Sequence, residues 1–186
     1  MSASDRARWD ARWREKGGPG EPSPLVLSLD AILPRRGRAL DVAGGAGRHA
    51  VWLARRGLDV TLVDISEVAL GIARGQGVQL FATAADLEIE PIPAGPWDLI
   101  LCFHYLDRAL FAEWPRLLAP GGLLVFVQAT RSNLQRHEHP SARFLLEDGE
   151  LARLVRGLEI VRLEEGWLDE GRHEARLVAR KTEQVA

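Results

Sequence analysis

The fold of this chain is decided by the stretch ALDVAGGAGRHA, residues 39–50. It predicts a short buried strand, a glycine-rich turn and the beginning of a helix. A second predicted strand, residues 58–63, follows and is closed by Asp64. Together these features indicate a site for a nucleoside-like cofactor at the carboxyl edge of a parallel sheet. An ionised Asp64 would accept hydrogen bonds from both ribose hydroxyls, because its carboxylate has two acceptor oxygens.

Two cofactors fit such a turn. Its Gly45-x-Gly47-x-x-Ala50 spacing satisfies the fingerprint of dinucleotide-binding proteins, which accepts alanine at the third position. Asp41, however, lies at the end of the first strand, where a carboxylate would face the pyrophosphate of a dinucleotide. The same carboxylate suits a ligand that carries a cationic ammonium and a sulfonium. The pairing of Asp41 with Asp64 therefore favours S-adenosylmethionine, and NAD bound by an oxidoreductase is the alternative.

Length and composition indicate an ordinary globular protein. The chain has 186 residues, 46% of them hydrophobic, which predicts a single domain with a full core. Its formal net charge is −2, and 24 basic residues are spread among 26 acidic ones. A general nucleic-acid binder would show a basic face, so we expect no nucleic-acid partner. We also expect a cytoplasmic protein without a membrane partner, because residues 1–16 lack a signal peptide's apolar core and no apolar run approaches the roughly 18 residues of a membrane span.

The sequence offers little for a metal. One cysteine, Cys102, excludes an internal disulfide and a site built from several cysteines. His137 and His139 flank Glu138, but nothing in the sequence supplies the remaining ligands of a metal ion. We therefore predict no metal.

Strands and helices alternate after an N-terminal helix over residues 4–16 and a connector rich in glycine and proline. This alternation predicts a parallel sheet with helices on both faces and a terminal antiparallel hairpin. The predicted strands are 38–42, 58–63, 78–82, 97–103, 123–128, 158–164 and 174–180. The predicted helices are 24–33, 47–56, 66–74 with Ser66 as N-cap, 107–118 and 147–156, and the prolines of 87–96 predict no full helix there. Residues 1–24 should form a lid helix and connector, and 25–186 the core.

Several segments resemble class I S-adenosylmethionine-dependent methyltransferases, especially the small bacterial group that includes the tellurite-resistance methyltransferases. The segments are DVAGGAGRHA (41–50), VTLVDIS (60–66), WDLILCFH (97–104), LLAPGGLLVF (117–126) and FLLEDGEL (144–151). The resemblance implies a Rossmann-like α/β fold with a mostly parallel seven-stranded sheet. It also implies methyl transfer from S-adenosylmethionine to a small-molecule acceptor, such as a thiol or an oxyanion of tellurium or selenium. We expect a monomer or a homodimer.

The resemblance implies roles for residues around the methionine and ribose of the cofactor. Asp41 would orient the methionyl ammonium. Gly45 and Gly47 would let the backbone approach the methionine and ribose, and Asp64 would bind the ribose hydroxyls.

A second group of residues is implied at the ends of the third and fourth strands and beside Asp64. Ile65 would pack on the adenine, with Leu87 alongside. Asp86 would accept a hydrogen bond from the adenine amino group. Cys102 and Phe103 would face the methionine portion.

The remaining candidates are less regular. Ala43 stands at a cofactor-binding position where the family pattern has glycine, and its methyl could crowd the ligand; this keeps open a third hypothesis, a non-catalytic binding protein. Arg48 opens a helix, where its charge opposes the helix dipole, so we expect it to meet the cofactor carboxylate. Trp13 would lie over the cofactor, since aromatic faces suit a sulfonium. His104 and Tyr105 follow the fourth strand, and we predict that they act on the acceptor as a general base or as contacts.

Overall fold

The structure is a computed structural model that describes residues 3–168 and 171–183. Its strands are β1 (Arg38–Val42), β2 (Asp59–Asp64), β3 (Phe81–Ala84), β4 (Trp97–Phe103), β5 (Leu118–Ala129), β6 (Glu159–Trp167) and β7 (His173–Arg180). Its α-helices are α1 (Ala3–Lys16), α2 (Pro24–Ser28), α3 (Arg48–Arg55), α4 (Glu67–Arg74), α5 (Leu110–Leu117) and α6 (Glu150–Leu154). Two short 3-10 helices, η1 (Arg131–Gln135) and η2 (Ala142–Phe144), follow β5.

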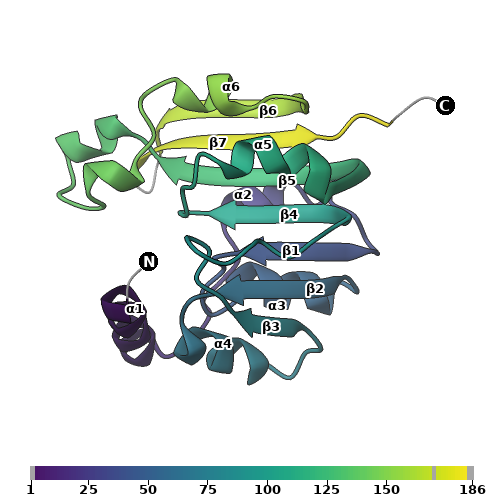
Figure 1. The fold of residues 1–186 in the computed structure, drawn as a ribbon, viewed down its shortest axis with the longest axis vertical. Coiled ribbons are helices and arrows are strands. Elements are labelled where there is room, and N and C mark those ends of the chain that lie inside the picture. The colour runs from purple at the N-terminus through teal and green to yellow at the C-terminus, as the bar shows by residue number, and fades with distance from the viewer. Residues whose placement is uncertain (1–2, 169–170, 184–186) are drawn as a thin grey trace.

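All seven strands form one sheet in the order β3-β2-β1-β4-β5-β7-β6 (Figure 1). Strands β1 to β5 run parallel, and β7 pairs antiparallel with β5 on one side and β6 on the other. The predicted fold class is therefore confirmed. The terminal hairpin is part of the main sheet, with its second strand inserted between β5 and the edge strand β6.

Helices cover both faces of the sheet and complete two hydrophobic cores. One core joins the sheet to α2, α3 and α4, and the other joins it to α5 and α6. The central strand β1 is buried from Ala39 to Val42, as expected for a parallel strand that is covered on both faces. The polar groups at the ends of such strands are thereby held against a rigid core.

The structure corrects several predicted boundaries. β3 begins at Phe81 rather than at residue 78, because Phe81 pairs with Thr61 and the preceding segment is a turn. The predicted helix 107–118 begins only at Leu110, because the Asp107 carboxylate accepts the Ala109 N–H at 2.9 Å and forms a turn instead. Predicted helices 24–33 and 147–156 shorten to α2 and α6, and the predicted turn 119–122 lies within β5.

Other predictions of local structure are confirmed. The strands 38–42 and 97–103 have the predicted bounds, and residues 87–96 contain no helix. Ser66 is the N-cap of α4, where its hydroxyl accepts the Ala69 N–H at 3.2 Å. Within the ranges that the structure describes, no helix is long and apolar enough to cross a membrane.

Candidate functional site

The carboxyl ends of the parallel strands meet at one edge of the sheet, and α1 lies beside this edge (Figure 1). The turn after β1 lies at this edge, and its glycines carry no side chains. Gly45 and Gly47 have φ angles of 59° and 76°, in the left-handed region that glycine adopts without steric cost. A Cβ built on Gly45 would lie 2.3 Å from Cζ2 of Trp13. Glycine is thus required at position 45 both by the backbone conformation and by the indole that packs on it.

The two residues before Gly45 are Ala43, which replaces the glycine of the family pattern, and Gly44. A Cβ on Gly44 would lie 2.5 Å from Cγ of Asp41, so glycine at this position makes room for the Asp41 carboxylate. Ala43 has a φ of 50°, a left-handed conformation that costs a non-glycine residue roughly 1–2 kcal/mol. Alanine therefore occupies a position whose backbone favours glycine.

Asp41 carries an unsatisfied buried oxygen. Asp41 lies near the end of β1 and is only 1% exposed. Its Oδ2 accepts the Ala50 N–H at 3.1 Å. Its Oδ1 has no hydrogen-bond partner among the residues that the structure describes. Burial raises the pKa of Asp41 to about 7, against the opposing effects of the Ala50 N–H and the Arg48 guanidinium. A cationic ligand at Oδ1 would satisfy this oxygen and favour the ionised carboxylate.

Asp64 ties the glycine turn to the end of β2. Its Oδ2 accepts the Gly45 N–H at 2.8 Å, and its Oδ1 accepts the Ser66 N–H at 2.9 Å. Burial raises its pKa, although these N–H groups favour the charged form. Because a carboxylate has about four acceptor positions, each oxygen can still accept a hydroxyl. The residue therefore both shapes the turn and remains able to bind a ribose.

The candidates for the adenine lie beyond β2 and β3. Ile65 follows β2 and is buried, and Asp86 and Leu87 follow β3 and are buried as well. The Asp86 Oδ1 accepts the Glu88 N–H at 3.1 Å, which fixes the carboxylate in the turn. These residues lie at the strand-end positions that the sequence predicted.

At the end of β4, the thiol of Cys102 is buried and bonded to the Tyr105 carbonyl oxygen at 3.5 Å. Burial raises the pKa of Cys102 far above its usual value, so it stays a thiol and is no nucleophile at neutral pH. Phe103 is half-buried, and its ring centroid lies 4.4 Å from that of His49. Cys102 thus serves packing, and Phe103 presents a face to the neighbouring cavity.

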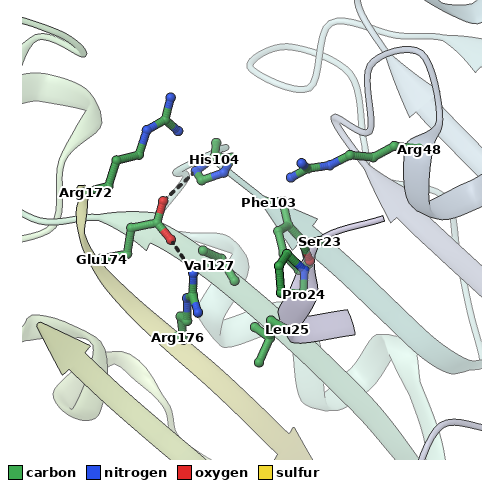
Figure 2. Close-up of a pocket in the computed structure, with 10 residues that line it drawn as sticks. All are labelled: Ser23, Pro24, Leu25, Arg48, Phe103, His104, Val127, Arg172, Glu174 and Arg176. Atoms are coloured by element: carbon green, nitrogen blue, oxygen red, sulfur yellow. Dashed lines mark hydrogen bonds and ion pairs between the residues drawn. The ribbon is translucent and has the colours of Figure 1, made fainter. Parts of the chain in front are cut away.

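A half-open cavity of about 340 Å³ lies next to this strand end (Figure 2). It is bounded by the N-terminus of α2, by α3, and by the ends of β4, β5 and β7. The Gly45 backbone, Asp64 and Asp86 do not line it, but Arg48 and Phe103, both predicted to contact the methionine portion of the cofactor, do, so the cavity adjoins the predicted cofactor seat. The lining residues are Ser23, Pro24, Leu25, Arg48, Phe103, His104, Val127, Arg172, Glu174 and Arg176.

His104 projects into this cavity from a left-handed backbone position, with a φ of 60°. Its Nδ1 lies 3.9 Å from Oε1 of Glu174. The pKa of His104 is lowered by desolvation and then by the neighbouring guanidinium groups, of which Arg172 has the largest effect. The ring is therefore neutral at pH 7, and it is a weaker base than an ordinary imidazole.

Tyr105 does not share this cavity with His104. Its ring packs in the hydrophobic core that contains α5 and α6, and its hydroxyl is buried without a partner in the described part of the chain. Burial raises its pKa well above the usual value. The structure therefore brings Arg48, Phe103 and His104 together at the cavity and leaves Tyr105 outside it.

The sequence reasoning missed the charged residues that β7 and the residue before it contribute. Arg172, Glu174 and Arg176 alternate, so they face the same side of the strand and line the cavity. Charged residues at 172, 174 and 176, followed by the apolar Leu177-Val178-Ala179, were a readable signal of a polar face on this segment. His137, by contrast, lies 2.7 Å from the Gly171 carbonyl, and residues 3–168 and 171–183 contain no group of three side chains that could hold a metal ion.

The comparison with known sequences gives the family. A model described as a methyltransferase domain matches residues 39–122. A ubiquinone biosynthesis O-methyltransferase from Azoarcus sp. strain BH72 is 30% identical over 187 residues, covering 82% of this chain and 79% of the relative. The chain belongs to the S-adenosylmethionine-dependent methyltransferases.

Other relatives of this methyltransferase-family chain agree in fold. An uncharacterised methyltransferase of Mycobacterium tuberculosis is 34% identical over 117 residues, 60% of this chain; the chain spans about half of that relative's length (48%). TehB from Haemophilus influenzae superposes with a TM-score of 0.70 at 21% identity, covering 85% of this chain and 61% of TehB. A protein described for converting a disulfide bond into a thioacetal group during echinomycin biosynthesis gives 0.72 at 19% identity, with 97% and 94% covered. These two structures support the fold alone.

Helix α1 packs on the part of the methyltransferase fold where the cofactor is expected. Its Asp10 Oδ1 accepts hydrogen bonds from the Ser66 hydroxyl at 2.5 Å and the Val68 N–H at 3.4 Å. Trp13 lies on Gly45, and the Lys16 ammonium lies 4.6 Å from the Trp13 ring centroid. These contacts lie at the N-terminus of α4 and at the glycine turn. The position suits the lid that the sequence predicted, and its closure over a cofactor stays a prediction.

We expect Asp10→Ala to speed amide exchange in residues 4–16, because the substitution removes the acceptor that joins α1 to α4. Addition of S-adenosylhomocysteine should slow the same amides in the native protein if the helix closes over the cofactor. Hydrogen-exchange mass spectrometry measures both effects, with Arg14→Ala on the exposed side of α1 as the matched control. Exchange that is slow in the free protein and indifferent to the cofactor would show a permanent element of the fold instead of a lid.

Proposed function

We propose that this chain binds S-adenosylmethionine at the glycine turn and transfers its methyl group to a small molecule in the adjoining cavity. The observation that carries the proposal is the Oδ1 of Asp41, which is buried and has no hydrogen-bond partner among residues 3–168 and 171–183, beside a turn where a Cβ has no room. A dinucleotide would bring a pyrophosphate to this carboxylate, whereas S-adenosylmethionine brings an ammonium. Family membership supports the same choice over the NAD-dependent oxidoreductase.

In this proposal the chain holds the cofactor with residues from the ends of four strands. Asp41 receives the ammonium, Asp64 the ribose hydroxyls and Asp86 the adenine amino group. Ile65 and Leu87 pack against the adenine. The backbone of residues 43–47 and that of Cys102 and Phe103 line the methionine portion, with Trp13 above the turn. The Arg48 guanidinium lies over the Phe103 ring and lines the adjoining cavity, where it is left for the acceptor.

The bound cofactor would supply a methyl carbon already activated by its positive sulfur. The protein then has to align a nucleophile with that carbon and exclude water, which is mainly catalysis by positioning. A polarizable thiolate, or an oxyanion of selenium or tellurium, needs little help from a base. An oxygen or nitrogen nucleophile would need one, and His104, neutral and facing the cavity, is placed to take that proton. We place the reaction in the cytoplasm, where thiols stay reduced.

Calorimetry with S-adenosylmethionine, S-adenosylhomocysteine and NAD tests the cofactor assignment directly. We expect micromolar affinity for the first two and none for NAD. Turnover of S-adenosylmethionine with a panel of thiols, selenite and tellurite then tests the transfer. Binding without turnover of any acceptor would favour the non-catalytic binding protein that Ala43 keeps open, and NAD binding would reject the proposal.

The pKa of Asp41 predicts a pH dependence of cofactor binding. A folded-state pKa of about 7 means that the carboxylate gains its proton as the pH falls below neutrality and loses its attraction for an ammonium. The affinity for S-adenosylhomocysteine should therefore fall about tenfold per pH unit below this value. Because 5′-methylthioadenosine has no ammonium, its affinity should stay nearly constant, and Asp41→Asn should flatten the profile of S-adenosylhomocysteine. A slope that survives in Asp41→Asn would contradict the assignment of the ammonium to Asp41.

A further inference from the structure

The described residues that line the cavity beside His104 carry more positive than negative charge (Figure 2). Three arginines and one glutamate line it, and the Glu174 carboxylate lies 3.4 Å from Nη2 of Arg176. No hydrogen bond or ion pair joins the guanidinium of Arg48 or of Arg172 to another residue in 3–168 or 171–183, and the Arg48 guanidinium lies 5.9 Å from the centroid of the Phe103 ring. Other arginines of this chain have carboxylate partners, such as Arg108 with Glu150 at 2.6 Å and Arg131 with Glu147 at 2.9 Å. The cavity therefore gathers positive charge in a protein whose net charge is −2.

Of these two cations, Arg48 is the one for which an anionic partner matters more, because Arg172 is exposed to solvent. Arg48 is half-buried at the first turn of α3, where the helix dipole repels a positive charge. Desolvation lowers its pKa, whereas Asp41 and Glu174 favour its charged form and Arg172, across the cavity, opposes it. Desolvation and then the neighbouring guanidinium groups lower the pKa of His104, which lies between them. An anion bound here would relieve the repulsion and supply the missing partners.

The opposite wall and the size of the cavity describe the rest of the ligand. Pro24, Leu25, Phe103 and Val127 give this wall an apolar surface. The volume of about 340 Å³ falls in the range of sites for small organic molecules, which begins near roughly 300 Å³. A bare inorganic oxyanion would leave most of this space and the whole apolar wall unused. The Glu174–Arg176 pair shows that the cluster already receives a carboxylate.

We propose that the methyl acceptor is a small organic carboxylate, whose anionic group binds between Arg48 and Arg172 while its apolar body lies against Leu25, Val127 and Phe103. This inference rests on the proposed function, because it names the acceptor class for the same site. The planar fork of a guanidinium matches a carboxylate with two parallel hydrogen bonds, so two arginines fix both its position and its orientation.

Paired probes that differ only in charge test the proposal. Calorimetry would titrate 4-mercaptobutanoate, its neutral amide and sulfate into the complex with S-adenosylhomocysteine. We expect the acid to bind at least about tenfold more tightly than the amide, since hydrogen bonds to charged groups contribute at least that much. Sulfate should bind more weakly than the acid. Arg172→Gln should remove most of the preference for the acid, while Arg162→Gln, which removes an exposed arginine of β6, should keep it.

The possible outcomes distinguish a failure of the carboxylate assignment from a failure of the proposed function. Equal binding of acid and amide, no binding of the acid, sulfate binding as tight as the acid, or an unchanged preference in Arg172→Gln would each overturn the carboxylate assignment. The affinity for S-adenosylhomocysteine, measured in the same samples, reports on the cofactor site alone. Intact cofactor binding with a failed preference would reject only the anionic acceptor, whereas loss of cofactor binding in the native protein would reject the proposed function.

Discussion

Gly45→Val is expected to abolish binding of S-adenosylhomocysteine while the protein remains folded. The new Cβ would lie 2.3 Å from Trp13 Cζ2, so either the indole or the turn must move. Gly45 also adopts a φ of 59°, which a β-branched residue avoids. A shift of the turn would break the 2.8 Å hydrogen bond from the Gly45 N–H to Asp64 and displace the two carboxylates proposed to hold the cofactor. We expect the affinity to fall by about 100-fold or more, equivalent to roughly 3 kcal/mol.

A second glycine provides the matched control for this substitution. Gly77 has a φ of 67°, close to that of Gly45, but a Cβ there would meet nothing within 4 Å. Gly77→Val should therefore cost similar backbone strain and lower the thermal midpoint by a similar amount, with cofactor affinity unchanged. Normal binding by a folded Gly45→Val protein would place the cofactor away from the turn. Equal loss of binding in both variants would trace the effect to stability rather than to the site.

The part of the site that sequence predicts is the part built from local backbone geometry. The turn after β1 needs glycines at fixed spacing, and Asp64 lies where β2 ends, so both features are visible within about 25 residues of sequence. The fold follows from the same alternation of strands and helices. Boundaries set by pairing partners were harder, as β3 shows, because its register depends on Thr61 of β2 rather than on its own residues.

The acceptor cavity depends on contacts between segments that are distant in sequence. Arg48 from α3 and His104 after β4 meet Glu174 only because β7 inserts next to β5. A strand inserted antiparallel brings its side chains to the carboxyl edge from the opposite direction. The alternating charges of residues 172–176 indicate a polar face, but they do not show where in the sheet that face lies. Tyr105 shows the converse, because it is adjacent to His104 in sequence yet packs into the opposite core. Adjacent residues at a strand end point to different faces of the sheet. The position of Tyr105 next to His104 in the sequence therefore did not indicate whether its side chain reaches the cavity.

Asp64→Asn is expected to weaken binding of S-adenosylhomocysteine by about 1–3 kcal/mol, because the ribose loses a charge-assisted acceptor. The same carboxylate accepts the Gly45 and Ser66 N–H groups, so an amide nitrogen would face one of these donors and loosen the turn as well. A loss of affinity alone therefore does not identify the ribose contact. The analogue of S-adenosylhomocysteine with a 2′-deoxyribose separates the two effects.

For the native protein, removing the 2′-hydroxyl from the ligand should cost about tenfold or more in affinity. For Asp64→Asn the same removal should cost much less, since the acceptor that the hydroxyl uses is already changed. The difference between the two costs is the coupling energy of a double-mutant cycle, and it cancels the general damage to the turn. Asp59→Asn, an exposed carboxylate at the beginning of the same strand, should show the full native cost of the deoxy ligand. If the hydroxyl is worth the same in native protein and in Asp64→Asn, then Asp64 shapes the glycine turn and does not bind the ribose.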